Sequence, residues 1–394
     1  MTNVTDLRPD PPSSLRVGVL CHSSVGGSAR VAAELARELV GRGHEVHLFA
    51  RSVPALLSEG SGVALHTVHS SAELDPKLDV TWTPTDLAAL SALATEVCRT
   101  RRLDVLHFHY ALPFAQVVVK AQARLGADGP AVVGTLHGTD VSRAARRRLS
   151  MLDALDAVTT VSHYQAQRAM HELGLARVPL VIPNTIDLCR FHPAPALVEP
   201  PRAPRILHVS NFRAIKDPVR VAQAFAAVRR RLDAHLWLVG DGDQMPAVRT
   251  ILDAAGVARD VRELGLRTDV DTIYGACDVA VLTSREESFS LVALEAAACG
   301  VPVIAPRVGG LPELVVDGVT GLLFDGDDAS EPAASIVQLL TDGARRLEMG
   351  RAAAAHARAY SHEEGIPRYE RIYRQVVHDR AQRPLAASGA LSAV

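Results

Sequence analysis

SREESFSLVALEAAACG, residues 284–300, is the stretch that constrains the fold of this chain most strongly. A polar turn leads directly into an apolar run with helical spacing, as expected where a loop at a strand end opens a helix. Glu287 precedes the first turn, and Glu295 lies about two turns along. Amides near residues 290–292 can bind phosphate oxygens, while the carboxylates accept hydrogen bonds from sugar hydroxyls. A solvated acidic cap on an ordinary helix is the weaker alternative.

Short β-type runs alternate with helical stretches on both sides of this segment. Upstream they cover residues 205–209, 236–239, 261–264 and 279–282, and downstream residues 303–305. The first half of the chain has the same pattern at residues 16–21, 45–50, 105–109, 131–136, 157–161 and 180–182. This alternation predicts an α/β protein whose doubly wound parallel sheets are covered by helices on both faces.

The chain is long enough for two such domains. Its 394 residues exceed the usual size of a single core, and 48% hydrophobic residues can build two. The proline-rich HPAPALVEPPRAP, residues 192–204, opposes helix and central strand and predicts the interdomain linker. The predicted parts are a disordered tail at 1–14, Rossmann-like domains at 15–195 and 205–361, a helix at 362–382 that packs back on the first domain, and a disordered tail at 383–394.

Composition excludes several classes of protein. Lys and Arg total 42 against 44 Asp and Glu, so no overall field attracts nucleic acid or an anionic membrane. The N-terminal region lacks an apolar signal core, and no run reaches the roughly 20 apolar residues of a membrane span. Five separated cysteines without a CxxC pair argue against a disulfide framework and a zinc site. We expect a cytoplasmic protein with reduced, mostly buried thiols.

A loop of small residues follows the first predicted strand. It reads SVGGS, residues 24–28, and it precedes a predicted helix. Gly26 and Gly27 let backbone amides approach an anion at the helix N-terminus, where a diphosphate would fit. The loop is not a full GxGxxG, so it gives little support for dinucleotide binding, and a tight turn without a ligand is an equal alternative.

The spacing of Glu287 and Glu295 resembles the E-x7-E signature of the retaining glycosyltransferases of family 4, and VGGLPEL at 308–314 matches a second pattern of that family. The resemblance implies the GT-B fold, in which two Rossmann-like domains face each other across a cleft. It also implies that Glu295 binds the ribose of UDP and that Glu287 holds the donor sugar near its anomeric carbon. The implied nucleotide-sugar site consists of Gly26, Gly27, Asn211, Lys216, Phe289, Ser290, Leu291, Val292 and Glu295.

The loop after the first strand of the second domain reads HVSNFRAIK, residues 208–216. Many family members have an arginine in place of its asparagine, but they keep the lysine. Lys216 is the leading candidate for neutralising the donor diphosphate, with Arg213 in support. An exposed surface lysine is the alternative, which the position after a strand makes weaker. Together with Glu287 and His137, these two residues form the predicted catalytic set.

The tripeptide Asp241-Gly242-Asp243 matches the DxD motif that binds a metal ion through the donor phosphates in the other glycosyltransferase fold. Here it follows a predicted strand as a glycine-containing turn, and motifs this short often mislead. The turn is the stronger interpretation. We therefore expect no metal and no cofactor, with the UDP-sugar acting as a substrate.

Four segments together resemble one branch of the family: SVGGS, HFHYALP at 107–113, TLHGTD at 135–140, and HVSNFRAIK. Members of that branch transfer N-acetylglucosamine from UDP-N-acetylglucosamine to the hydroxyl of L-malate with retention, the first step of bacillithiol biosynthesis. The similarity runs from about residue 16 to residue 373. The implied acceptor contacts in the first domain are Ser28, Tyr110, Thr135, His137 and Arg148. Taken alone, His137 would more often be a core histidine that ends its strand.

One segment departs from the branch. Between Asp140 and Asp156 this chain is several residues shorter, and Leu149 falls nearest the position of an arginine that binds malate in the branch. Arg148 lies beside it, in a cluster that also contains Arg143, Arg146 and Arg147. The cluster could supply the bidentate contacts that a dicarboxylate needs, or it could be an exposed basic helix face.

Three alternatives stay open: a family 4 enzyme with a different small-molecule or lipid acceptor, an epimerase acting on UDP-N-acetylglucosamine, and a catalytically silent binding module. No carboxylate is securely placed for a double displacement. The resemblance therefore favours a same-face substitution in which a donor phosphate helps take the acceptor proton. Enzymes of this type are often dimers, which makes a homodimer the assembly to test.

Overall fold

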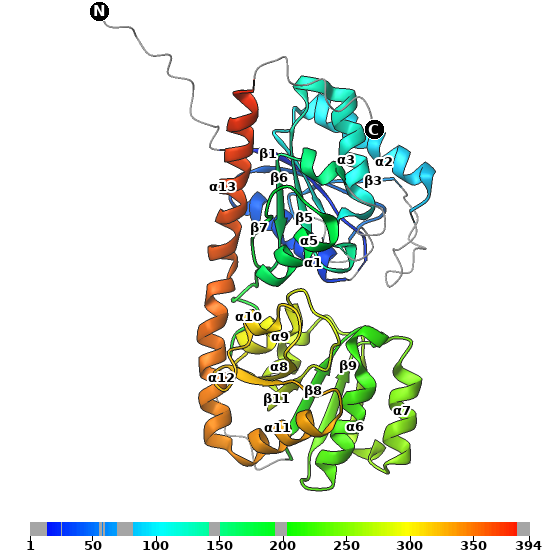
Figure 1. Cartoon of the computed structure of the whole chain (residues 1–394), viewed down its shortest axis with the longest axis vertical. Helices are drawn as coiled ribbons and strands as arrows, with labels where there is room; N and C mark the ends of the chain where they lie inside the picture. The colour runs from blue at the N-terminus through cyan, green and yellow to red at the C-terminus, as the bar shows by residue number, and fades with distance from the viewer. Residues whose placement is uncertain are drawn as a thin grey trace, which may run out of the picture. The chain divides into compact units, whose positions relative to one another are not determined.

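The computed structural model describes residues 14–24, 26–54, 57, 60–68, 82–141, 150–193 and 203–383. By its contacts the chain divides into two compact units (Figure 1). The first comprises Met1–Ile182 with Gly365–Val394, and the second Pro183–Glu364. In the part of the chain that is described, no helix is both long and apolar enough to cross a bilayer.

The first unit is built on a parallel sheet of seven strands in the order β3-β2-β1-β4-β5-β6-β7. The strands are β1 Arg16–Leu20, β2 Glu45–Ala50, β3 Ala64–Thr67, β4 Val105–His109, β5 Ala131–Leu136, β6 Ala157–Thr160 and β7 Leu180–Val181. The helices include α1 Gly27–Gly41, α2 Pro84–Arg101, α3 Ala111–Leu125, α5 His163–Leu173 and α13 His362–Ala381, the last of which starts in the second unit.

Side chains of successive strand residues enter cores on opposite faces of this sheet. In β4, Val105 packs into the core covered by α1 and α13, whereas Leu106 and Phe108 pack into the core under α2 and α3. Both faces of the sheet are therefore covered by helices, as parallel sheets require. Ligands can reach such a sheet at its strand ends, which is where the functional residues must be sought.

The second unit repeats the design with six parallel strands in the order β10-β9-β8-β11-β12-β13. The strands are β8 Arg205–Val209, β9 His235–Val239, β10 Val261–Gly265, β11 Val279–Val281, β12 Val303–Pro306 and β13 Gly321–Phe324. The helices include α6 Pro218–Arg229, α7 Met245–Ala254, α8 Val270–Gly275, α9 Leu291–Ala298, α10 Leu311–Leu314, α11 Ser330–Thr341 and α12 Gly343–Ala357. Together the sheets confirm the predicted fold class of two doubly wound α/β domains.

Every strand predicted from the sequence is present, and its ends lie within a residue of the predicted ones. Two further strands were not predicted. β3 is a four-residue edge strand whose residues are all at least partly exposed, and β13 is a four-residue strand that begins at Gly321. The exposure of β3 and the glycine in β13 weaken the apolar pattern by which the other strands were predicted. The five cysteines are free thiols, four of them buried, in agreement with the expectation.

Contacts group residues 183–193 with the second unit, whereas the sequence analysis assigned them to the first. The reason is a β-bridge between Ile186 and Ser361 and an ion pair between Arg190 and Asp271. From Gly365 onward the chain clusters with the first unit. Most of the predicted linker and nearly all of the two predicted tails lie outside the described residues.

Glu370 fastens α13 to the first unit. Its Oε1 lies 2.8 Å from Nε2 of His44, and its Oε2 lies 3.0 Å from Nη2 of Arg42. Burial by itself raises the pKa of Glu370, but the hydrogen bonds and charges of Arg42 and His44 outweigh it and hold the pKa below its usual 4.5. Further along α13, the hydroxyl of Tyr373 lies 2.7 Å from Nδ1 of His107.

We expect Glu370→Gln to lower the free energy of unfolding by about 1–3 kcal/mol at neutral pH, because it removes a charge that two partners share in a buried place. Since the folded-state pKa is depressed, the stabilisation is present above pH 4.5 and is lost as the pH falls through the folded-state value. Urea unfolding at several pH values measures this. Glu96→Gln, which breaks an exposed pair with Arg99, should cost much less, because solvent screens that pair. Equal losses in the two variants would contradict the assignment.

Candidate functional site

The carboxyl ends of β8 and β11 form the switch point of the second sheet, where the strand order reverses. The loop after β8 carries Lys216, and the loop after β11 carries Glu287. Their charged groups meet, with Nζ of Lys216 2.6 Å from Oε1 of Glu287. The fold thus joins two residues 71 positions apart, both selected in the sequence analysis, at one place.

The loop that carries Lys216 is tied to the neighbouring strand end. Thr283 Oγ1 donates its proton to the carbonyl of Asp217 at 2.7 Å and lies 3.2 Å from the carbonyl oxygen of Lys216. The amide of Arg285 donates to the carbonyl of Ile215 at 2.9 Å. These bonds fix the backbone on which Lys216 stands, so the place of its ammonium group is not left to a flexible side chain alone.

Glu287 is held through its side chain and its backbone. The carboxylate is 9% exposed and accepts hydrogen bonds from Lys216 and, at 2.9 Å, from Ser284 Oγ. The amide of Gly310 donates to the Glu287 carbonyl at 2.9 Å. Gly309 has φ +58°, and a Cβ there would lie 1.8 Å from the same carbonyl oxygen. The glycine pair in VGGLPEL therefore allows a close backbone contact that sets the position of Glu287.

The helix that follows, α9, begins at the same edge of the sheet. Ser290 is its N-cap, with φ 83°, and its hydroxyl accepts a hydrogen bond from the amide of Ala293 at 3.3 Å. The amides of Leu291 and Val292 lie in the first turn, where an α-helix offers no internal acceptor. Such amides can bind an anion, and the helix dipole favours negative charge at this end.

Glu295 lies inside α9, a little over one turn from its start and not the two turns expected, because the helix begins only at Leu291. It is 4% exposed. Its Oε2 accepts a hydrogen bond from the hydroxyl of Tyr274 at 3.0 Å. The second carboxylate of the signature is thus buried and held by a residue that the sequence analysis did not select.

The remaining predicted residues of the second unit differ in exposure. Asn211 and Arg213 are exposed in the loop after β8. Phe289 is 2% exposed, and its ring packs against Tyr360 with the centroids 5.7 Å apart. Phe289 can therefore offer a ligand its backbone, while its side chain anchors the loop that carries Glu287.

The tripeptide at 241–243 forms a tight turn after β9. The amide of Gly242 donates to Oδ1 of Asp241 at 2.8 Å, and a Cβ at Gly242 would lie 2.0 Å from the carbonyl oxygen of Asn211. The glycine thus lets this turn pack directly on the loop after β8. Within the described ranges, no three His, Cys, Asp or Glu side chains are grouped so that they could hold a metal ion.

The first unit has a matching switch point between β1 and β4. Gly26 is the N-cap of α1, with extended φ and ψ of −69° and 159°, and Gly27 and Ser28 are the first residues of the helix. The two glycines are exposed and Ser28 is half-buried. The loop therefore presents the N-terminal amides of α1 at the carboxyl edge of this sheet.

Rings line the same edge of the first sheet. His22, which follows β1, lies 5.2 Å from the ring of Tyr110 and 4.9 Å from that of Phe114. Trp82 Nε1 donates to Nδ1 of His22 at 3.4 Å. Tyr110 has φ 84°, and its hydroxyl lies 2.7 Å from Oγ1 of Thr139. Tyr110 thus takes a conformation rare for a tyrosine at the start of α3.

The structure uses Thr135 differently from the predicted acceptor contact. Its side chain is fully buried, and Oγ1 lies 2.7 Å from Nε2 of His107 and 2.6 Å from Oγ1 of Thr159. The hydroxyl is therefore bonded within the interior of the sheet. Successive residues of a strand point to opposite sides, so a residue near a strand end can belong to the core.

His137 lies at the strand edge, and its Nε2 is 3.0 Å from Nδ1 of the buried His109. Burial lowers the pKa of His137 to about 3, with His22 adding to the effect, and burial also lowers the pKa of His107 to about 3. These imidazoles are neutral at physiological pH. His107 is bonded on both ring nitrogens inside the protein, whereas His137 can exchange hydrogen bonds with a ligand without supplying positive charge.

Asp140 organises this edge although it was not among the predicted site residues. Its carboxylate is fully buried and accepts from the amides of Ala111 at 2.9 Å, Gly138 at 2.8 Å, Val141 at 3.1 Å and His137 at 3.1 Å. It thereby joins the start of α3 to the loop after β5. The sequence signal that could have indicated Asp140 was its place as the last residue of the TLHGTD segment.

Arg148 and the neighbouring arginines, which the sequence analysis proposed for the acceptor, lie outside the described residues.

Comparison with known proteins decides the family. Residues 25–190 match the model of the Glycosyltransferase Family 4, and residues 203–342 match that of the Glycosyl transferases group 1. N-acetyl-alpha-D-glucosaminyl L-malate synthase of Bacillus anthracis is 34% identical over 93% of this chain and 98% of its own length. The chain belongs to glycosyltransferase family 4.

Other relatives of this glycosyltransferase have different acceptors in their names. D-inositol 3-phosphate glycosyltransferase of Geodermatophilus obscurus is 31% identical over 90% of this chain and 86% of its own length.

HepE of Anabaena, solved in complex with UDP-glucose, is 20% identical and has a TM-score of 0.74 over 94% of this chain and 100% of its own. The likeness to HepE shows the fold, and the GT-B class predicted from the sequence is confirmed.

We expect Gly309→Ala to destabilise this glycosyltransferase by at least about 3 kcal/mol and to reduce sugar transfer, because the added Cβ must push the backbone of Glu287 away. Gly318→Ala is the matched control, since Gly318 also has a positive φ of 74° but open space around its Cβ position. Its cost should be about 1–2 kcal/mol, with transfer retained. Thermal unfolding and transfer rates measure both. Similar losses would show that the contact with Glu287 is unimportant.

Proposed function

We propose that this enzyme transfers N-acetylglucosamine from UDP-N-acetylglucosamine to the hydroxyl of L-malate, with retention at the anomeric carbon. The observation that carries the proposal is the ion pair of Lys216 and Glu287 beside the N-terminus of α9. It combines a cation, helix amides and a carboxylate, which are the groups that a sugar diphosphate needs. The L-malate synthase from Bacillus anthracis supports the acceptor.

The donor would be bound by the second unit. The first-turn amides of α9 and Lys216, with the exposed Arg213 nearby in the chain, would neutralise the diphosphate. Glu295 would accept hydrogen bonds from ribose hydroxyls, and Glu287 from the sugar. The complex of HepE with UDP-glucose supports a UDP-sugar as the donor class.

The ion pair also suggests how the site responds to its substrate. Lys216 is 25% exposed and paired with Glu287, so the cation is already oriented before a phosphate arrives. An incoming diphosphate would compete with Glu287 for the ammonium group. The carboxylate would then turn to the sugar hydroxyls, so one event both binds the phosphates and frees the group that holds the sugar.

Breaking the anomeric bond requires stabilisation of the leaving UDP, which Lys216 and the helix amides would provide. A double displacement would need a carboxylate free to attack the sugar. After the diphosphate has taken Lys216, Glu287 would still accept from Ser284 Oγ and be held at its backbone by Gly310, and its carboxylate would accept from the sugar hydroxyls, which makes it a poor nucleophile. We therefore propose a same-face substitution in which a donor phosphate oxygen takes the acceptor proton.

The acceptor would be bound by the first unit at the edge formed by Ser28, Tyr110 and His137. Tyr110 and His137 offer neutral hydrogen-bonding groups, so the charge of a dicarboxylate must be met by other residues. The arginines at positions 143–148, which lie outside the described residues, are the candidates. A second acceptor, D-inositol 3-phosphate, is favoured by the relative from Geodermatophilus obscurus.

The proposed reaction uses no metal ion, because Lys216 and the helix amides would supply the positive field. Asp241 supports this view, since its carboxylate is bonded to the amide of Gly242 within a turn. Cytoplasmic location and a homodimer stay predictions.

The product assay tests the function directly. With UDP-N-acetylglucosamine, we expect UDP release to depend on L-malate and not on D-inositol 3-phosphate, and to survive a chelator. Mass spectrometry should find the glycosylated malate, and NMR should find the α-anomer. If UDP were released with D-inositol 3-phosphate and not with L-malate, the inositol phosphate would be the acceptor. Conversion of the donor without any acceptor would indicate an epimerase.

We expect Glu287→Gln to bind free UDP about fivefold more tightly, because the ammonium of Lys216 loses its competing partner. The same variant should transfer sugar at least about 100-fold more slowly. Glu286→Gln removes an equal charge one position away and should change UDP affinity by less than about twofold. Calorimetry and initial rates measure these effects. Weaker UDP binding in Glu287→Gln would contradict the proposed competition.

A further inference from the structure

We propose that Tyr274 is a positioning residue that sets the preference of this enzyme for a ribonucleotide, by orienting the carboxylate of Glu295 toward the ribose. The inference rests on the proposed function and deepens it, because it names the group that determines selectivity in the nucleotide part of the donor.

The contact between the two side chains is the starting point. Glu295 is 4% exposed, and a carboxylate buried to that degree needs hydrogen-bond donors. The hydroxyl of Tyr274 lies 3.0 Å from Oε2 of Glu295 and 3.3 Å from the carbonyl oxygen of Val292. A phenol has a single proton to donate, and the charged, nearer acceptor takes it. Tyr274 therefore fixes one oxygen of Glu295.

Tyr274 is itself rigidly placed. It is fully buried, among the largest such side chains of the described residues, and its ring meets that of Phe191 edge to face at 6.4 Å. A buried aromatic ring of this size has no room to change rotamer. The hydroxyl of Tyr274 thus acts as a fixed donor and not as a mobile one.

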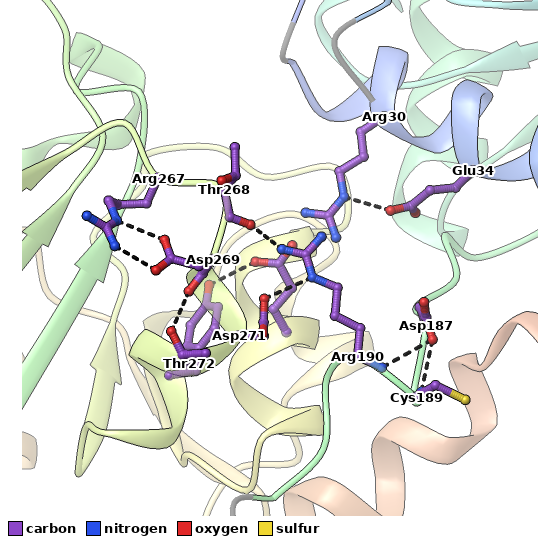
Figure 2. Close-up of polar contacts among 12 residues, drawn as sticks. Arg30, Glu34, Asp187, Cys189, Arg190, Arg267, Thr268, Asp269, Asp271 and Thr272 are labelled. Atoms are coloured by element: carbon purple, nitrogen blue, oxygen red, sulfur yellow. Dashed lines mark hydrogen bonds and ion pairs between the residues drawn. The ribbon is translucent and has the colours of Figure 1, made fainter. Parts of the chain in front are cut away.

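The helix that carries Tyr274, α8, is anchored from the segment after β7. Figure 2 shows the guanidinium of Arg190 lying between Asp271 and Thr268. Its Nε is 2.9 Å from Oδ1 of Asp271, and its Nη2 donates to the carbonyl of Thr268. Oδ1 of Asp187 accepts from the amide of Arg190 at 3.2 Å. A continuous set of contacts therefore runs within the second unit from Arg190 through α8 to Glu295.

This arrangement has a consequence that packing alone would not have. With Oε2 held, the carboxylate plane of Glu295 is fixed, and ribose hydroxyls meet an acceptor already in place. Without the tyrosine hydroxyl, Oε2 of Glu295 loses this donor and the carboxylate loses part of that preorganisation. A nucleotide that carries ribose hydroxyls would bind more weakly, whereas one without them would be unaffected.

The test compares binding of UDP and of 2′,3′-dideoxy-UDP by calorimetry. The wild-type enzyme should prefer UDP by at least about tenfold, since hydrogen bonds to a charged group are involved. Tyr274→Phe keeps the ring and should reduce that preference about five- to tenfold, by weakening UDP and leaving the dideoxy nucleotide unchanged. Unchanged dideoxy binding also shows that the variant is folded.

Tyr373→Phe is the matched control. It removes a buried tyrosine hydroxyl too, but one bonded to His107 in the first unit, and it should leave the ratio unchanged. If Tyr274→Phe weakens both nucleotides equally, Tyr274 is only a packing residue. If it changes neither affinity, its hydroxyl has no role in nucleotide binding. Either result overturns this inference and leaves the proposed function standing. A wild-type enzyme that binds both nucleotides equally would instead remove the ribose role of Glu295, and with it the proposed donor site.

Discussion

The ion pair of Lys216 and Glu287 is the interaction on which the proposed donor site of this enzyme depends. A carboxylate that is 9% exposed would carry a large desolvation cost alone, and the ammonium group at 2.6 Å offsets it. The same pairing keeps a cation at the end of the sheet where phosphates are expected. One contact therefore stabilises a buried carboxylate and orients a cation for the proposed binding site. The close approach of Gly309 to the backbone of Glu287, and the hydrogen bond from the Thr283 hydroxyl to the carbonyl of Asp217, hold the two loops in place.

Parallel topology explains why the site lies where it does. Strand order reverses between β8 and β11, and the loops after these two strands meet at the carboxyl edge, where Lys216 and Glu287 pair. The first unit has the same reversal between β1 and β4. The two edges differ in chemistry, however, since the second has a cation and acidic groups while the described part of the first has rings and neutral imidazoles around His137.

That difference agrees with the proposal that the second unit binds the donor and the first unit binds the acceptor. A sugar diphosphate is highly charged and needs a positive field, which the second unit offers through Lys216 and the start of α9. The hydroxyl of the proposed acceptor needs orientation and protection from water, for which neutral groups on a framework held by Asp140 are suited, while the charge of a dicarboxylate must be met by other residues. The proposed acceptor edge is thus organised by a buried carboxylate that satisfies backbone amides.

The sequence by itself determined the fold and selected the charged residues of the proposed donor site. Strand and helix periods are local, so strand limits were predicted to within a residue, and Lys216, Glu287 and Glu295 stand in segments with a clear pattern. Tertiary structure alone decided what each side chain touches. It buried Thr135 in a network with His107 and brought Tyr274 to Glu295 from another helix, because such contacts depend on distances between segments that no local pattern encodes.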